Sequence, residues 1–328
     1  MKKISTLLLA VMLGLSGLVK AQQDPQFTQF MYCKQAYNPA VVGTDGSICF
    51  NALYRQQWVS FPGAPKTGLF GFNMPLNVLG GMGVGFYFAN DQLGFMASNS
   101  ARLQAAKHFI FPNGGILSAG LDAGIFQQRI NGTFVAPVTL NDPAIPSNTL
   151  TTAPALNKLV PDVGLGIYFT VPDQMYVGVS TSHVSAQELK GDQVFGKYNL
   201  TFDMARHYYI IGGYHFKFSG GNSIVTPNIK IKTDAATTQV DFNLTYMINR
   251  MFWLGATYRL QDAVAPMLGI QDIIPSLKGL KIGYSYDVTL SKIKGYSSGT
   301  HEVMLGYCLK PKPPVKAQSH WNVRYFED

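Results

Sequence analysis

The feature that most constrains this chain is an alternation of apolar residues with small or polar ones, repeated from residue 47 onward. Between residues 280 and 290 every even position is apolar, whereas the odd positions carry lysine, glycine, serine, aspartate and threonine. Residues 82–88, 163–169 and 239–246 alternate in the same way. A period of two is typical of a β-strand with one apolar face. The sequence therefore predicts an all-β protein.

Two all-β architectures fit such strands, a soluble β-sandwich and a transmembrane β-barrel. Only 13% of the residues are charged, against about 25% in soluble domains. Aromatic residues also lie at the ends of the expected strands, as in the interfacial girdles of membrane barrels; they include Phe109, Phe111, Phe169, Phe216 and Phe218. We therefore expect a transmembrane antiparallel β-barrel, which needs no helical anchor.

Residues 1–21 read as a signal peptide for export. Lys2 and Lys3 precede an apolar run over residues 7–19, and Val19 and Ala21 fit the positions before a cleavage site. An uncleaved anchor is disfavoured because this run is shorter than the ~20 residues that span a bilayer. We expect the mature chain to begin at Gln22 and to reach the outer membrane. The cysteines Cys33, Cys49 and Cys308 are odd in number and scattered along the sequence, so they imply no disulfide framework.

The alternation predicts about fourteen strands between residues 47 and 309. They cover residues 47–60, 66–74, 80–90, 95–109, 114–128, 162–170, 174–183, 202–218, 223–233, 238–248, 251–260, 263–271, 279–290 and 300–309. Tight turns alternate with longer connections, among them 129–161 and 184–201, which we expect on the cell exterior. An even number of strands puts both termini on one side. We expect residues 22–46 and 310–328 to be periplasmic segments.

Searches for catalytic and cofactor motifs find none that is complete. His301 and Glu302 begin a zinc-protease motif, but Leu305 replaces its second histidine. A phosphate-binding loop pattern over residues 191–198 ends in Tyr198, where a serine or threonine would hold magnesium. Without the signal segment the net charge is about +5, too low and dispersed for nucleic-acid binding. We expect no enzymatic activity, no cofactor and no nucleic-acid partner.

Ionisable residues on the polar faces of the strands form the first candidate site. Charge is costly against lipid, so these side chains should point into the lumen; they are Lys230, Asp241, Arg259, Lys281, Asp287 and Glu302. They form either a structural network of paired charges or a selectivity or docking surface. The second candidate is the tail, where a proline-rich spacer at 310–314 precedes Trp321, Arg324, Tyr325 and Phe326. This composition favours partner docking over a disordered end.

Several sequence blocks resemble one family, the PorP/SprF outer-membrane proteins of the type IX secretion system. The blocks are residues 24–31, 37–40, 54–67, 252–259, 283–287 and 299–307. The resemblance implies a non-enzymatic outer-membrane barrel that works with lipoprotein and ring subunits in the periplasm and with secreted cargo or a surface adhesin. It makes Asn38, Pro39, Arg55 and Trp58 candidate partner contacts. We expect a role in protein secretion or gliding; the alternative is a passive channel for small solutes or lipids.

Overall fold

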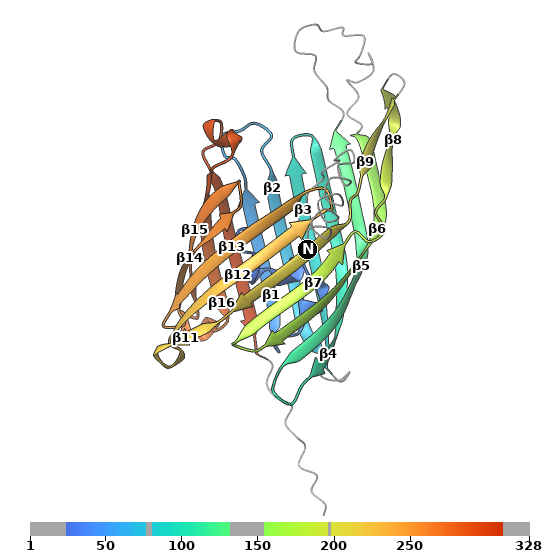
Figure 1. The fold of residues 1–328 in the computed structure, drawn as a ribbon. Coiled ribbons are helices and arrows are strands. Elements are labelled where there is room, and N and C mark those ends of the chain that lie inside the picture. Colours follow the sequence, from blue (N-terminus) through green and yellow to red (C-terminus); the bar gives the residue numbers. More distant parts are fainter. Residues whose placement is uncertain (1–23, 77–80, 132–153, 196–197, 311–328) are drawn as a thin grey trace, which may run out of the picture.

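The computed structural model describes residues 24–76, 81–131, 154–195 and 198–310. Within these residues fourteen antiparallel strands form a closed barrel (Figure 1). One barrel strand is made of two pieces, β10 (His207–Tyr214) and β11 (Phe216–Phe218), which both pair with β12 (Ser223–Thr233). The barrel closes where the first strand, β1 (Ile48–Gln56), pairs with the last, β17 (Thr300–Leu309). The predicted fold class is confirmed.

The other strands of the barrel lie close to their predicted ranges. They are β2 (Lys66–Leu76), β3 (Met82–Leu93), β4 (Met96–Ile110), β5 (Ile116–Asn131), β6 (Pro154–Val171), β7 (Met175–Ser182), β13 (Thr238–Ile248), β14 (Phe252–Arg259), β15 (Ala263–Gln271) and β16 (Leu280–Thr289). Two predicted loops are corrected. Strands β5 and β6 extend into 129–161, and 184–201 overlaps a separate hairpin of β8 (Glu188–Phe195) and β9 (Tyr198–Asp203).

The period of two separates a lipid-facing surface from a lumen-facing surface. On β13 the side chains of Phe242 and Leu244 are about half exposed, whereas the intervening Asp241 and Asn243 are buried. The other barrel strands show the same contrast between an apolar outer face and a polar or small inner face. Among the described residues, the helical segments are too short to cross a bilayer. The alternation read from the sequence is thus the inside–outside pattern of the barrel wall.

The connections differ between the two ends of the barrel. At one end, here called the short-turn end, β4 leads to β5 over residues 111–115, β6 to β7 over 172–174, and β11 to β12 through the helical turn η5 (Ser219–Gly221). The β8–β9 hairpin projects from the opposite, long-loop end (Figure 1). The helical turn η6 (Pro275–Leu277) lies at the short-turn end and η7 (Lys292–Gly295) at the long-loop end. Strand β1 starts and β17 finishes at the short-turn end.

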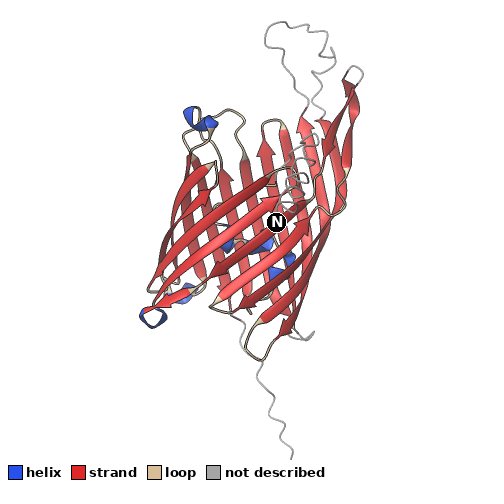
Figure 2. Cartoon of the chain, in the orientation of Figure 1, coloured by secondary structure: helices blue, strands red, loops and turns tan. Residues whose placement is uncertain are grey.

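Residues 24–46, here called the lumen segment, fill the interior of the barrel. The segment contains the helical turns η1 (Phe30–Tyr32), η2 (Lys34–Ala36) and η3 (Pro39–Val41), which lie within the barrel in Figure 2. Asp24 lies at the long-loop end, beside Ser182 and His183, and Gly43 lies near the short-turn end, beside Asn73. This differs from the expectation of a periplasmic segment. Wall side chains bind its backbone, and its apolar side chains are shielded from water.

Glycines on the inner wall make room for the lumen segment. A Cβ atom on Gly83 would lie 2.0 Å from the carbonyl oxygen of Val42, and one on Gly120 would lie 2.3 Å from the backbone nitrogen of Ala40. Real Cβ atoms do not approach backbone so closely. Several inner-wall glycines, among them Gly83, Gly120 and Gly166, are therefore contact points for the segment.

A disulfide joins the two strands at which the barrel closes. Cys49 on β1 and Cys308 on β17 are direct partners in the strand register and are bonded to each other. Cys33, in the lumen segment, is a buried free thiol. The scattered spacing of the cysteines implied no disulfide framework, and the Cys49–Cys308 bond corrects this expectation. The reason is simple. Residues separated by 259 positions become neighbours only when the first and last strands pair.

Candidate functional site

A network of buried charges lines the lumen toward the long-loop end and includes five of the six predicted lumen residues. Arg55 contacts Asp287 at 2.7 Å and Glu302 at 2.9 Å. Arg259 continues the network to Asp287 at 3.1 Å and to Asp241 at 3.3 Å. Its far end is the pair of Lys230 with Asp241, whose side-chain nitrogen and oxygen are 2.8 Å apart. Three buried cations and three buried carboxylates therefore balance one another, and Arg259 also pairs at 3.3 Å with Asp262, which is partly exposed.

Strand register brings these charges together. Arg55 faces Glu302 across the pairing of β1 with β17, and Asp241 faces both Lys230 on β12 and Arg259 on β14. Each lies on the inner face of its strand, with at most 2% of the residue exposed. Removing one partner of such a buried pair costs about 3–5 kcal/mol, because the other charge is left uncompensated.

The network holds the lumen segment as well as the wall. The Glu302 carboxylate accepts hydrogen bonds from the backbone N–H groups of Thr28 at 2.8 Å and Gln29 at 2.7 Å. The Thr28 hydroxyl donates to Asp287 at 2.8 Å, and Lys230 donates to the carbonyl of Phe27 at 3.2 Å. Hydrogen bonds to charged groups are stronger than neutral ones. The charges therefore fix residues 27–29 to the barrel wall.

Lys281 is the predicted lumen residue that stays outside this network. It lies on the lumen face of β16, toward the short-turn end, and is half-buried. Within the described part of the chain it forms no ion pair closer than 4.0 Å. Lys281 lies on the same lumen face as the other charges, but sharing that face does not bring it into contact with them.

The predicted partner contacts lie in different environments. Asn38 is buried in the lumen, where its side chain accepts from the Ala40 N–H at 2.9 Å and donates to the carbonyl of Ile167 at 3.0 Å. The neighbouring Pro39 is also buried, and Arg55 belongs to the charge network. These side chains are occupied by contacts within the barrel. Of the predicted contacts, Asn38, Pro39 and Arg55 therefore hold the lumen segment in place.

Trp58 lies at the long-loop end, between β1 and β2, and its backbone N–H donates to the Thr300 hydroxyl at 3.1 Å. The remaining predicted contacts, Trp321, Arg324, Tyr325 and Phe326, lie outside the described residues.

Aromatic residues of the barrel wall also pack against the lumen segment, outside the charge network. The ring of Tyr32 lies 4.8 Å from that of Trp253, and the ring of Tyr37 lies 5.4 Å from that of Tyr209. The ammonium group of Lys34 lies 4.2 Å from the centre of the Tyr176 ring, a cation–π contact. The segment is thus held by packing and by charge along its length.

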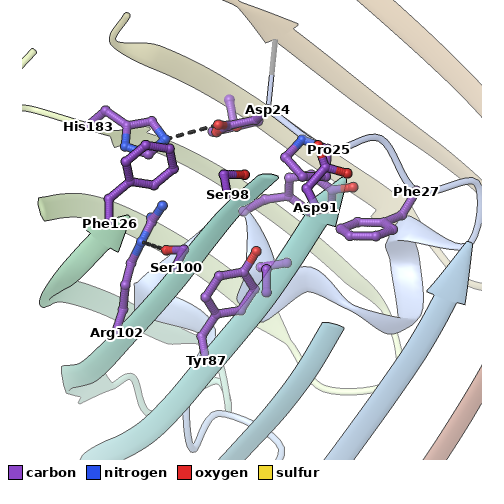
Figure 3. Close-up of a pocket in the computed structure, with 14 residues that line it drawn as sticks. Asp24, Pro25, Phe27, Tyr87, Asp91, Ser98, Ser100, Arg102, Phe126 and His183 are labelled. Carbon is purple, nitrogen blue, oxygen red and sulfur yellow. Dashed lines mark hydrogen bonds and ion pairs between the residues drawn. The ribbon is translucent and has the colours of Figure 1, made fainter. Parts of the chain in front are cut away.

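A second polar cluster, which sequence reasoning missed, lies at the long-loop end of the lumen. Asp24 is 3.0 Å from Nε2 of His183 (Figure 3). Nδ1 of His183 is 3.0 Å from Asp162. The Arg102 guanidinium lies 3.0 Å from Asp162 as well. Burial alone would lower the pKa of His183, but the two carboxylates raise it to about 9. Burial likewise opposes ionisation of Asp24, but His207 and His183 hold its pKa well below the usual range.

Beside this cluster is a small cavity of about 30 Å³, lined by side chains that include Asp24, Tyr87, Arg102 and His183 (Figure 3). One water-sized probe occupies roughly 10–15 Å³ on this measure, so the cavity has room for a few water molecules. It could hold a small ion with its water, but a larger ligand would not fit.

Several solved structures of outer-membrane proteins match this chain at low similarity. The monoaromatic hydrocarbon channel CymD is 13% identical, with a TM-score of 0.49 over 92% of this chain and 96% of that one. The toluene transporter TbuX of Ralstonia pickettii is 12% identical, with a TM-score of 0.47 over 85% and 93%. Omp33 of Acinetobacter baumannii is 9% identical, with a TM-score of 0.44 over 80% and 98%. Likenesses of this strength carry no information about function.

No curated protein matches the sequence. The family described as "Type IX secretion system membrane protein PorP/SprF" matches residues 19–307, which include the whole lumen segment and nearly the whole barrel. The resemblance noted in the sequence blocks is therefore confirmed over most of the chain, and the protein belongs to the PorP/SprF family of type IX secretion system membrane proteins.

Proposed function

We propose that this outer-membrane barrel is a non-enzymatic component of a type IX secretion or gliding machine, and that it anchors partner proteins rather than conducting solutes. Family membership supports the secretion role. The observation that carries the anchoring role is the lumen segment, which occupies the barrel from the long-loop end to the short-turn end. A barrel filled in this way suits a scaffold in the membrane better than an open pore.

The contacts of the segment argue against the passive-channel alternative. Solute passage would require residues 27–29 to leave Glu302, Asp287 and Lys230, and each contact is a buried, charge-assisted hydrogen bond. It would also require the backbone of residues 40–42 to leave its close contact with the wall glycines. These bonds must break together, because the residues are consecutive or nearly so.

The two ends of the barrel offer different surfaces to partners. In membrane barrels the longer loops face outward and the shorter turns face the periplasm. On this basis the β8–β9 hairpin would meet secreted cargo or an adhesin on the cell surface. The chain after β17 would leave the short-turn end, so residues 310–328 would meet the ring and lipoprotein subunits in the periplasm.

Conductance in a planar bilayer tests the closed lumen. The purified full-length mature barrel should give no steady current, whereas a variant lacking residues 24–46 should conduct once its heat-modifiable mobility on gels shows that it has folded. An ordinary porin inserted in the same way controls for incorporation. A steady open pore in the wild-type protein would favour the passive channel and overturn the proposal.

Co-purification in mild detergent tests each of the two proposed partner surfaces separately. Deleting residues 311–328 should leave the barrel folded and remove the periplasmic ring subunits. Replacing residues 188–203 by a short turn should keep those subunits and remove cargo or adhesin. If both variants retain every partner of the wild type, the assignment of these surfaces is refuted.

A further inference from the structure

Three residues that are far apart in the sequence meet at the long-loop end of the lumen. Asp24 begins the described lumen segment, His183 directly follows β7, and His207 begins β10. One ligand atom from each lies within 4.8 Å of the other two. Each histidine is 3% exposed, and Asp24 is half-buried. Neither the charge network around Arg55 and Arg259 nor the proposed partner surfaces include these side chains.

The surroundings of the two imidazoles resemble those of metal-binding histidines. Such a histidine directs one ring nitrogen at the metal and the other at a carboxylate or a backbone carbonyl. His183 has Nδ1 at 3.0 Å from Asp162 and Nε2 at 3.0 Å from Asp24. His207 has Nδ1 at 3.1 Å from the carbonyl of Ala205 and 3.8 Å from the Asp24 carboxylate, and its Nε2 accepts a hydrogen bond from the Asp24 backbone N–H at 3.3 Å. A metal ion bound at Nε2 would replace this hydrogen bond.

The Asp24 carboxylate is oriented as well. It accepts hydrogen bonds from the Tyr209 hydroxyl and, at 3.2 Å, from the Ser182 hydroxyl. The small cavity borders both Asp24 and His183. A water molecule there could occupy a fourth ligand position, as in metal sites with three protein ligands.

We propose that Asp24, His183 and His207 bind one divalent transition-metal ion of the Zn²⁺ type. Two imidazoles and a carboxylate suit zinc and its neighbours better than calcium or magnesium, which prefer all-oxygen sites. At zinc–ligand distances of 2.0–2.1 Å, the ligands of a tetrahedral site lie about 3.3 Å apart. The three atoms would therefore need to close by no more than about 1.5 Å at the widest pair, from the separation of 4.8 Å.

Such an ion would link the lumen segment to the barrel wall. Asp24 belongs to the segment, whereas both histidines belong to the wall. Binding would tie the start of the segment to β7 and β10 at the long-loop end, three residues before the stretch 27–29 that the buried charges hold. The competing arrangement needs no metal: His183 alone carries the positive charge between Asp24 and Asp162.

Metal titration of the whole mature barrel distinguishes these arrangements. The protein is purified in detergent without a histidine tag, stripped with EDTA and titrated with Zn²⁺ in a calorimeter. We expect one ion per chain with a dissociation constant of micromolar or lower. His183→Gln and His207→Gln should each weaken binding at least 100-fold. The matched control is His301→Gln, because His301 is exposed on the outer wall and should not affect binding.

Two further measurements keep the test decisive if a histidine variant folds poorly. Co²⁺ added to the stripped wild-type protein should give the strong visible absorption of a four- or five-coordinate site. Zn²⁺ should also slow amide hydrogen exchange in residues 24–31 of the wild type. Absence of stoichiometric binding, or binding that persists in both His183→Gln and His207→Gln, would overturn the proposal.

Discussion

Replacing Glu302 by glutamine is the most direct test of how the lumen segment is held. The substitution keeps the size of the side chain but removes its charge. It also exchanges one accepting oxygen for an NH₂ group that cannot accept a hydrogen bond. Glu302 now accepts from Arg55 at 2.9 Å, from the Thr28 N–H at 2.8 Å and from the Gln29 N–H at 2.7 Å. In the variant at least one of these donors loses its acceptor.

The expected loss of stability follows from burial. Both Arg55 and Glu302 are shielded from water, so the arginine left behind cannot recover its solvation. Breaking a buried ion pair in this way costs about 3–5 kcal/mol. Because every 1.4 kcal/mol is a factor of ten, local opening of residues 28–29 should become about 140- to 4000-fold more frequent.

Hydrogen exchange followed by mass spectrometry measures this opening directly in peptides that cover residues 24–31. A matched control is Glu188→Gln on the β8–β9 hairpin, where the carboxylate is half exposed and 3.7 Å from Lys190. Exposed pairs contribute about 0–1 kcal/mol, so this variant should resemble the wild type. If exchange at residues 28–29 is equally slow in Glu302→Gln, the charges do not hold the segment and the reasoning fails.

Two other substitutions probe packing and closure. Gly120→Ala should lower the free energy of unfolding by about 1–3 kcal/mol, because its Cβ would lie 2.3 Å from the Ala40 nitrogen. Gly68→Ala, where no other atom lies within 4 Å of the Cβ, is the control in the same urea titration, and equal midpoints would contradict the close contact. Cys308→Ser should cost about 2–4 kcal/mol by freeing a link between residues 259 positions apart. A reductant should destabilise the wild type and leave this variant unchanged; an insensitive wild type would exclude a stabilising disulfide.

Part of the charge network could be predicted from hairpin geometry. The short connection between β12 and β13 pairs Thr233 with Thr238, so equal steps along each strand bring Lys230 opposite Asp241. The turn after β13 places Arg259 opposite Asp241 in the same way. A period of two and a tight turn are enough for these contacts, because both are local. Lys281 shows the limit, since its inner face was predictable but its distance from the other charges was not.

The contacts of the lumen segment had no comparable signal. Arg55 and Glu302 meet only because the first and last strands pair, and Asp24 meets His183 and His207 only because the segment enters the barrel. The sequence of residues 24–46 is polar and aromatic without alternation, which also fits an exposed terminal segment. The alternation marked an inner face of small and polar residues, but it did not identify the chain that fills the lumen.

The sequence by itself determined the strands, their number and the face on which each side chain lies, because alternation and turn chemistry act between neighbours along the chain. Only the tertiary structure decided that the lumen is filled, which charges hold the filling segment, and that Cys49 bonds to Cys308. Those contacts depend on closing the barrel and on the path of one terminal segment through it. Residues that meet in this way are far apart in the sequence, so no local sequence pattern predicts that they will be in contact.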